Sequence, residues 1–180
     1  MNQESFSLKP FPNSGPVPGV EIAGTIARRS HTLVLDYILR GQVAELVIPV
    51  PSDTPARKPG LWQETCFEFF LAPRNSPRYW EFNLSPAGHW NAYRFADYRQ
   101  GLLEEPAIMS LPFGIRSQPN ALRLTLELDL DRLVPVDQTL EVAISAVIQR
   151  RDGAMSYWAL THCGQVPDFH HRDSFALVLG

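Results

Sequence analysis

Alternation of apolar and polar residues is the dominant pattern along this chain, and it is clearest between residues 121 and 130. Leucine occupies every even position from 122 to 130, while Arg, Thr, Glu and Asp occupy the odd positions between them. Successive side chains of a β-strand point to opposite faces of its sheet, so this pattern predicts a strand with one buried face. Less regular versions of the pattern predict further strands at residues 31–39, 43–49, 64–71, 78–85, 89–95, 139–149, 155–161 and 174–179.

Helical periodicity is scarce, and short helical turns are expected only near residues 98–104 and 130–134. Strands that follow one another without intervening helices predict an all-β fold, an antiparallel two-sheet β-sandwich with at most short helical turns. The first twenty residues are polar and contain four prolines, so residues 1–20 are expected to form a proline-rich arm. Residues 21–180 are expected to form a single sandwich domain.

Composition and charge narrow the classes of partner. The 180 residues carry a formal net charge of −3 and are 44 % hydrophobic. This balance argues against disorder, and the lack of a basic run argues against nucleic acid and anionic membranes as partners. No apolar run is long enough to span a membrane, and the first residues show no secretory signal. The isolated Cys66 and Cys163 are therefore expected to be buried, reduced thiols of a cytoplasmic protein.

A proline-bounded turn joins the expected strands at residues 64–71 and 78–85. Pairing the last residue of the first strand with the first residue of the second gives an apolar face and a polar face, on which Glu68 opposes Glu81. Directly opposed Cβ atoms lie about 4.5–5.5 Å apart, so two carboxylates at these positions repel one another. A neighbouring cation or a shared proton would relieve that repulsion.

The turn at residues 85–88 leads into a third strand. Closing the hairpin directly around this turn places Trp90 beside Asn83, and it places Arg94 one diagonal step from Glu81, where it can neutralise a carboxylate. One face of the three-stranded unit then carries acidic, amide, aromatic and basic side chains: Glu64, Glu68, Tyr79, Glu81, Asn83, Ser85, Trp90 and Arg94.

Several interpretations of this polar face remain open. A polar sheet face can simply be solvated. Aromatic rings beside carboxylates and amides also suit a sugar, because rings cover its apolar C–H surface while polar groups bind its hydroxyls. A carbohydrate-active enzyme of the glycoside hydrolase type is an alternative, with Glu68 and Glu81 as its paired carboxylates. A protein-interaction domain that uses an exposed sheet is another.

Three stretches of the chain resemble a known family: LWQETCFEFFLAP from residue 61, YWEFNLSPAGHWNAYRFADYR from residue 79 and YWALTHCGQVPDFHHRDSFALVL from residue 157. They resemble DOMON-like β-sandwich proteins, which are similar to family 9 carbohydrate-binding modules. The resemblance implies a jelly-roll-like sandwich with a pocket for sugars or haem at one sheet. Haem-binding relatives use a Met/His axial pair, whereas Met155 is the one methionine here in an expected strand. We therefore expect no cofactor, and we expect a carbohydrate or a small sugar-like metabolite as the ligand.

Histidines gather near the C-terminus, where His162, His170 and His171 lie close in sequence to Cys163 and Asp168. Their spacing matches no zinc motif, so no metal site is expected. Neighbouring side chains of an extended segment point to opposite sides, so the two adjacent histidines cannot both join one site. We expect a loop in which Asp168 caps backbone N–H groups and His162 or His170 lines the ligand site.

Two tryptophans, Trp62 and Trp158, flank expected strands. A tryptophan in such a place packs in the core, unless it is exposed, in which case it favours stacking on a ligand. Together these patterns favour a ligand-binding protein over an enzyme, with the ligand on the sheet face formed by residues 64–95 and the oligomeric state left open. The candidate ligand-binding residues are Glu64, Glu68, Tyr79, Glu81, Asn83, Trp90, Arg94, His162 and His170.

Overall fold

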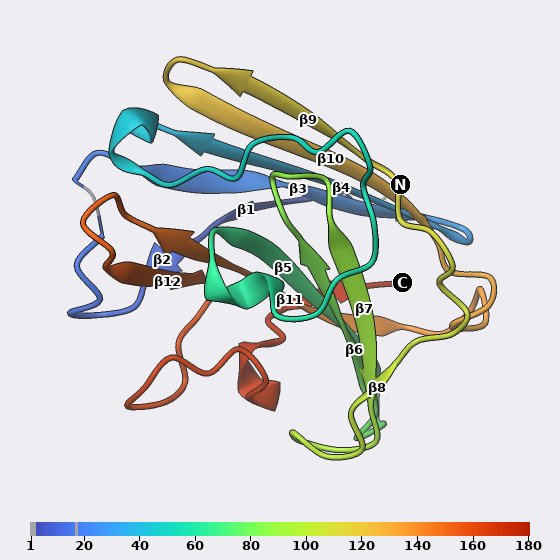
Figure 1. Ribbon diagram of the computed structural model, residues 1–180. Helices are drawn as coiled ribbons and strands as arrows, with labels where there is room; N and C mark the ends of the chain where they lie inside the picture. Colours follow the sequence, from blue (N-terminus) through green and yellow to red (C-terminus); the bar gives the residue numbers. More distant parts are fainter. Residues whose placement is uncertain (1–2, 17) are drawn as a thin grey trace.

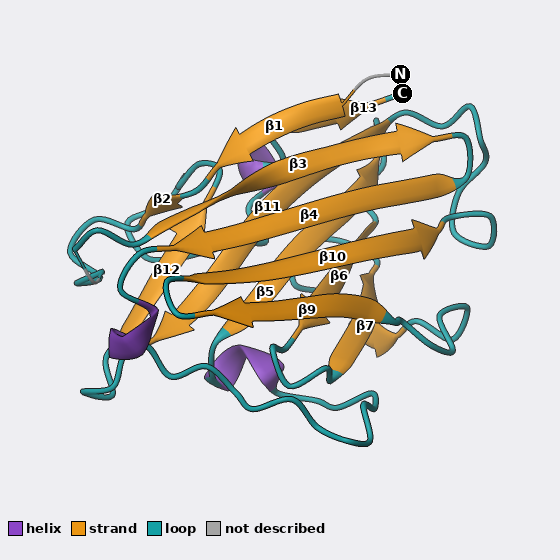
Figure 2. Cartoon of the chain, turned by 90° about the horizontal axis from the view of Figure 1, so that it is seen from above, coloured by secondary structure: helices purple, strands orange, loops and turns teal. Residues whose placement is uncertain are grey.

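Two antiparallel β-sheets pack face to face in the computed structural model, which describes residues 3–16 and 18–180 (Figure 1). Within these residues the first sheet contains, in spatial order, β1 (Gln3–Ser7), β3 (Glu21–Arg29), β4 (Thr32–Arg40), β10 (Ala121–Asp129) and β9 (Phe113–Gln118). The second sheet contains β2 (Lys9–Pro10), β12 (Met155–Ala159), β11 (Leu140–Gln149), β5 (Cys66–Pro73), β6 (Tyr79–Leu84), β7 (Trp90–Phe95) and β8 (Leu103–Glu104), with β13 (Leu177–Leu179) also paired to β11. Figure 2 shows the strands of the two sheets crossing at an angle. The prediction of an all-β antiparallel sandwich is confirmed.

Helical structure in the described part of the chain is limited to three short 3-10 helices: η1 (Val43–Glu45), η2 (Leu61–Gln63) and η3 (Arg172–Ser174). None of the helices in residues 3–16 and 18–180 has the length and apolar character needed to cross a membrane.

Some expected elements differ from the observed ones. The strand expected at residues 43–49 is wrong, because η1 begins there and Leu46 makes only an isolated bridge to Arg150. The expected strand at residues 174–179 starts late, since η3 occupies its first position. Residues 130–134 form the expected short turn, in which the amides of Leu133 and Val134 donate to the backbone oxygen of Leu130, whereas the stretch 98–104 ends in strand β8.

The main core lies between the two sheets and is built from alternate residues of the facing strands. The even-numbered leucines of β10 point into it, as their alternation predicts, and Phe69 stacks on Phe82 with ring centroids 4.5 Å apart. Tyr37 of β4 is fully buried in this layer, and its hydroxyl donates to the backbone oxygen of Glu68 at 2.6 Å. Each fully buried large apolar side chain contributes about 1.5–3 kcal/mol relative to its exposed state, so this layer holds the sheets together.

A second, smaller cluster lies on the outer face of the second sheet. It contains Phe70, Tyr79 and Phe95 from the sheet and Phe175 from the C-terminal segment, which crosses this face as the red chain in Figure 1. Strand β5 is therefore buried on both faces along nearly its whole length. The expectation that this face could be a simple solvated surface is wrong, because the C-terminal segment covers it.

The N-terminal segment links the two sheets. Strand β1 pairs with β3 in the first sheet, and β2 then pairs with β12 in the second. Phe6 and Leu8 are buried along the way, and the ring of Phe6 contacts that of Tyr37 edge-on at 5.5 Å. The proline-rich arm expected over residues 1–20 thus takes part in both sheets, although residues 1, 2 and 17 of that arm lie outside the described residues.

Strand β5 pairs with β6 two residues further along than expected. Glu68 lies opposite Asn83, and Glu81 lies opposite Phe70. The expected direct opposition of Glu68 and Glu81 is therefore wrong. Because the side-chain period of a strand is two, a shift of two residues still leaves both carboxyl groups on the expected face.

Strand β7 pairs with β6 one residue further along than expected, and this single step has larger consequences. Leu84 lies opposite Trp90, because the turn before β7 contains one more residue and holds Gly88 in the left-handed region at φ +88°. A one-residue slip moves every side chain to the other face. Trp90 consequently enters the main core, and Arg94 pairs with Trp80, away from the polar face.

Candidate functional site

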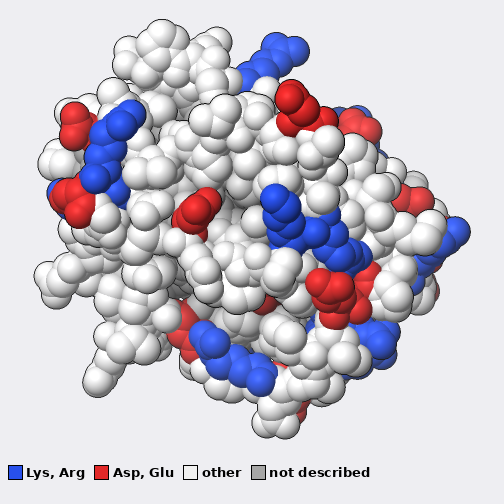
Figure 3. All heavy atoms as spheres, viewed as in Figure 1, with Lys and Arg blue, Asp and Glu red and all other residues white. Residues whose placement is uncertain are grey.

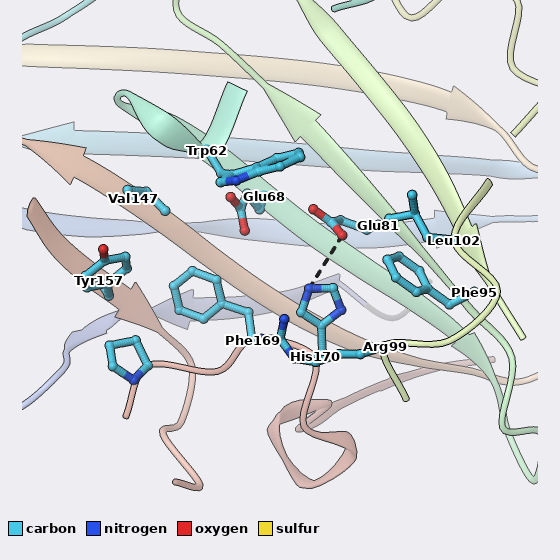
Figure 4. A pocket seen from close by; sticks show the side chains of 11 residues that line it. Trp62, Glu68, Glu81, Phe95, Arg99, Leu102, Val147, Tyr157, Phe169 and His170 are labelled. Atoms are coloured by element: carbon cyan, nitrogen blue, oxygen red, sulfur yellow. Dashed lines mark ion pairs between the residues drawn. The ribbon is translucent and has the colours of Figure 1, made fainter. Parts of the chain in front are cut away.

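A cavity of about 400 Å³ opens on the outer face of the second sheet. Its floor comes from β5, β6, β11 and β12, and its rim comes from η2, the loop that follows β7 and the segment that precedes η3 (Figure 4). Elements that are far apart in the sequence thus meet around one hollow, which is lined by the buried Glu68 and Glu81.

Two carboxyl groups lie at the floor of the cavity, one on each of two adjacent strands. Glu68 of β5 and Glu81 of β6 are both buried. Glu81 Oε1 accepts a hydrogen bond from Asn83 Nδ2 at 2.9 Å, and Glu68 Oε2 accepts one from Ser145 Oγ at 3.4 Å. The two glutamates are diagonal neighbours in the sheet, for which the backbone spacing is about 7–8 Å.

Burial disfavours the ionised form of both carboxyl groups. It raises the pKa of Glu81 to about 7, even though the Asn83 hydrogen bond and the Arg99 charge act in the opposite direction. Burial also raises the pKa of Glu68 well above its ordinary value, and the neighbouring Glu81 charge raises it further. Both acids at the floor of the cavity therefore hold their protons more tightly than an exposed glutamate does.

A partly buried imidazole faces these acids from the C-terminal segment. His170 Nδ1 lies 2.8 Å from the Tyr79 hydroxyl, and His170 Nε2 lies 3.6 Å from Glu81 Oε2 (Figure 4). Burial, with the Arg99 charge, lowers the pKa of His170 to about 4, so the ring is neutral at pH 7 and the Glu81 contact is not a full ion pair. The Arg99 amide N–H donates to the Tyr79 hydroxyl at 3.1 Å, and with this hydroxyl donating in turn to His170 Nδ1, the Nε2–H is directed at Glu81.

Asp168 ties two loops together at the rim. Its carboxylate accepts hydrogen bonds from the Arg99 guanidinium at 2.8 Å and from the His170 amide at 3.0 Å, and it also accepts one from the Tyr98 hydroxyl. Burial alone would raise the pKa of Asp168, but these hydrogen bonds lower it overall. Asp168 caps a backbone N–H in its loop, as expected, and it also fixes the loop after β7 against the C-terminal segment.

Aromatic side chains form the walls of the cavity. Trp62 projects from η2 with 42 % of its surface exposed, and its ring meets that of Tyr93 edge-on at 6.1 Å. Tyr157 and Phe169 lie next to each other on the wall opposite Trp62, with their ring centroids 6.3 Å apart. Figure 4 shows the two carboxyl groups between Trp62 on one side and Phe169 and His170 on the other.

The structure brings some of the candidate residues together and places others behind them. Glu68, Glu81 and His170 line the cavity directly. Tyr79 and Asn83 lie one step further in, where Tyr79 orients the His170 ring and Asn83 holds the Glu81 carboxyl group.

Four other candidate residues lie away from the cavity. Trp90 is 6 % exposed in the main core, where the Arg57 guanidinium stacks on its ring at 4.5 Å. Arg94 lies on the opposite side of the sheet beside Leu103, so it cannot neutralise the carboxyl groups. The two others, Glu64 and His162, are positioned by loops.

Glu64 follows η2 and is exposed, because the expected strand begins only at Cys66. His162 Nε2 donates to the backbone oxygen of Lys9 at 2.8 Å, and its ring packs edge-on against Phe11 at 5.1 Å. His162 therefore fastens the N-terminal segment rather than lining the cavity.

Several cavity residues were not among the sequence candidates: Trp62, Phe95, Arg99, Tyr157 and Phe169. Trp62 carried a usable signal, because a tryptophan just before a strand suits stacking when it is exposed, and this one is. Arg99 and Phe169 come from loops, for which alternation gives no orientation.

Among residues 3–16 and 18–180, no three His, Cys, Asp or Glu side chains gather in a metal-binding arrangement. Cys66 is buried, as expected, but Cys163 is exposed, because it lies in the loop after β12 rather than in a strand.

On the face shown in Figure 3, acidic and basic side chains are interspersed.

No protein-family model matches the chain, and no curated protein sequence matches it significantly. Solved structures do resemble it. One is described as a putative carbohydrate-binding protein from Bacteroides uniformis ATCC 8492, with a TM-score of 0.73 and 15 % sequence identity over 99 % of this chain and 85 % of the other.

Two further structures come from a family 9 carbohydrate-binding module of Caldicellulosiruptor kristjanssonii. The complex with glucose has a TM-score of 0.55 and 10 % identity, and covers 91 % of this chain and 78 % of the other. The complex with cellotriose has a TM-score of 0.50 and 11 % identity, and covers 87 % and 72 %. The predicted resemblance to family 9 carbohydrate-binding modules is thereby confirmed as structural similarity: the chain shares the β-sandwich fold of carbohydrate-binding modules.

Proposed function

We propose that this protein binds a small carbohydrate in the cavity on the outer face of its second sheet. The observation that carries the proposal is the make-up of the cavity, in which aromatic walls enclose buried polar side chains. Its volume of about 400 Å³ falls within the range of about 300–1,000 Å³ that is typical of small-ligand pockets. Related folds with glucose or cellotriose bound support the same ligand class.

The chemistry of the lining suits a sugar ring. Trp62 and Phe169 can cover the apolar C–H faces of a pyranose, while a sugar hydroxyl can donate to the Glu81 carboxylate. The Nε2–H of neutral His170 and the Arg99 guanidinium supply donors for hydroxyl oxygens. A sugar needs donors and acceptors in about equal measure, and this lining offers both.

Isothermal titration calorimetry with glucose, cellobiose and cellotriose tests the proposal. We expect at least one of these sugars to bind, and Trp62→Ala to weaken that binding by about tenfold or more because a stacking surface is lost. Met109→Ala is the matched control, since Met109 is 80 % exposed and lies outside the cavity lining. Equal sugar affinity in wild type and Trp62→Ala would contradict a site in this cavity.

A second candidate, glycoside hydrolysis, is favoured by one observation. Glu68 and Glu81 both line the cavity, and burial raises the pKa of Glu81 to about 7, which suits a general acid near neutral pH. Incubation with chromogenic β-glucosides separates the two functions. Turnover that disappears in Glu81→Gln would support hydrolysis, whereas sugar binding without turnover would leave a binding protein.

A further inference from the structure

We propose that the cavity discriminates in favour of a sugar that carries a protonated primary amine, so that an amino sugar binds more tightly than the matching neutral sugar. This inference rests on the proposed carbohydrate-binding function and specifies the substrate class of the same site. It follows from the charges, the unfilled hydrogen-bonding positions and the aromatic walls around Glu68 and Glu81.

The charges around the cavity do not balance at its floor. Glu68 and Glu81 are both buried there, on adjacent strands. Among the described residues that line the cavity, Arg99 is the single Lys or Arg, and its guanidinium is already bound to Asp168 at 2.8 Å. His170 is neutral because burial lowers its pKa to about 4. The two carboxyl groups therefore lack a cation of their own.

Hydrogen-bond acceptors also outnumber donors at this point. Each carboxylate offers two oxygens with about four lone-pair positions, whereas the hydrogen bonds within residues 3–16 and 18–180 supply one donor to Glu81 and one to Glu68. Asn83 Oδ1 is also buried and receives no hydrogen bond from the described residues. An ammonium group brings three donors and one positive charge, which is the complement of this arrangement.

The aromatic walls of the cavity also favour a positively charged ligand. Trp62, Tyr157 and Phe169 enclose the space beside the carboxyl groups, and the negative faces of aromatic rings attract cations. With a neutral sugar, both acids must be protonated for the site to be neutral. An ammonium group instead pairs with a carboxylate in a poorly hydrated cavity, where the attraction between opposite charges is stronger than in water.

Calorimetric titration of the full chain with glucosamine, glucose and N-acetylglucosamine at pH 6.5 tests this proposal. N-acetylglucosamine keeps a substituent at the same carbon but removes its charge. We expect glucosamine to bind about tenfold or more tightly than either neutral sugar. We also expect Glu81→Gln and Glu68→Gln each to reduce that preference to about threefold or less, with thermal unfolding confirming that each variant folds.

Glu127→Gln is the matched control, because it removes one negative charge from an exposed position of β10, far in the fold from the cavity floor. It should keep the full preference for glucosamine. Glucose binding as tightly as glucosamine in the wild type would overturn the amino-sugar inference while leaving carbohydrate binding intact. Failure of all three sugars to bind would instead overturn the proposed function, and this inference with it.

Discussion

The two faces of the second sheet are made by alternate residues of the same strands, yet they differ in chemistry. The inner face is apolar, with Phe69 stacked on Phe82 and Trp90 packed beside Leu84. The outer face is covered in part by the C-terminal segment, and it holds carboxyl, amide, imidazole and phenol groups around a cavity. Burial alone therefore does not mark the core of this protein.

The contrast separates the layer that stabilises the fold from the face that carries the proposed binding site. Apolar groups in the inner layer are stabilised by leaving water, whereas each ionised carboxyl group of the outer layer is destabilised by the same burial. A face that keeps such groups without a full set of partners is a candidate binding site. Substitutions on the two faces should therefore separate folding from ligand binding.

The largest expected effect is on the inner face. Trp90→Ala should lower the free energy of unfolding by about 3–5 kcal/mol, because it empties a buried site and removes the ring on which Arg57 stacks. Urea denaturation followed by circular dichroism measures the change. A variant with wild-type stability that had lost sugar binding would show that Trp90 belongs to the ligand site after all.

The second largest effect is a dependence of the free energy of unfolding on pH, which comes from acids of the outer face. Burial raises the pKa of Glu81 from 4.5 to about 7, so the folded state binds this proton more tightly than the unfolded state does. The free energy of unfolding should therefore fall as pH rises from about 4.5 to 7, by up to about 3 kcal/mol from this group. In contrast, burial lowers the pKa of His170 to about 4, so the contribution of this residue to the free energy of unfolding rises as pH increases from about 4 to 6.5.

The variant Glu81→Gln removes the pH dependence that comes from Glu81 and keeps the one that comes from His170. Urea denaturation at pH 5, 6.5 and 8 should show a smaller loss of stability toward high pH in the variant than in the wild type. Stability curves that run parallel across this range would mean that Glu81 titrates normally in the folded protein. Glu127→Gln, on an exposed position, should follow the wild type.

A smaller effect is expected at the rim that joins the two loops. Asp168→Asn should lower the free energy of unfolding by about 0.5–1 kcal/mol, because its ion pair with Arg99 is partly exposed to water. Amide hydrogen exchange should become faster in residues 97–101, which this carboxylate holds against the C-terminal segment. Unchanged exchange in that loop would show that other contacts hold the rim closed.

The smallest effect on stability is expected at Trp62. Its ring is 42 % exposed at the mouth of the cavity, so Trp62→Ala should change the free energy of unfolding by no more than about 0.5 kcal/mol while weakening sugar binding. Thermal melting of this variant beside Trp90→Ala compares the two tryptophans directly. A large destabilisation of Trp62→Ala would place its ring in the fold rather than in the binding site.

Sequence reasoning recovered the sandwich because alternation reports which side chains share a face. It kept Glu68 and Glu81 on one face even though their register was wrong, since a shift of two residues preserves the face. It failed at Trp90, where one extra residue in the turn flips the whole strand. That extra residue depends on the geometry at Gly88, which alternation does not report.

The rest of the cavity could not be read from local patterns. Arg99 and Phe169 reach it from loops that are joined by contacts across about seventy positions of sequence, such as the Arg99–Asp168 ion pair. Trp62 reaches it from a short 3-10 helix that the sequence did not predict. A strand pattern places side chains on a face, but it does not show which loops fold over that face.

The central claim, that a sugar binds in the cavity on the outer face, is tested most directly by the tryptophan indole N–H signals in nitrogen-15 NMR spectra. The chain has four tryptophans, and Trp62 lines the cavity while Trp80, Trp90 and Trp158 are buried in the main core. On titration with glucose and then glucosamine, the Trp62 signal should shift in a saturable way, with little change in the other three. Saturable binding that leaves the Trp62 signal unmoved would contradict the account.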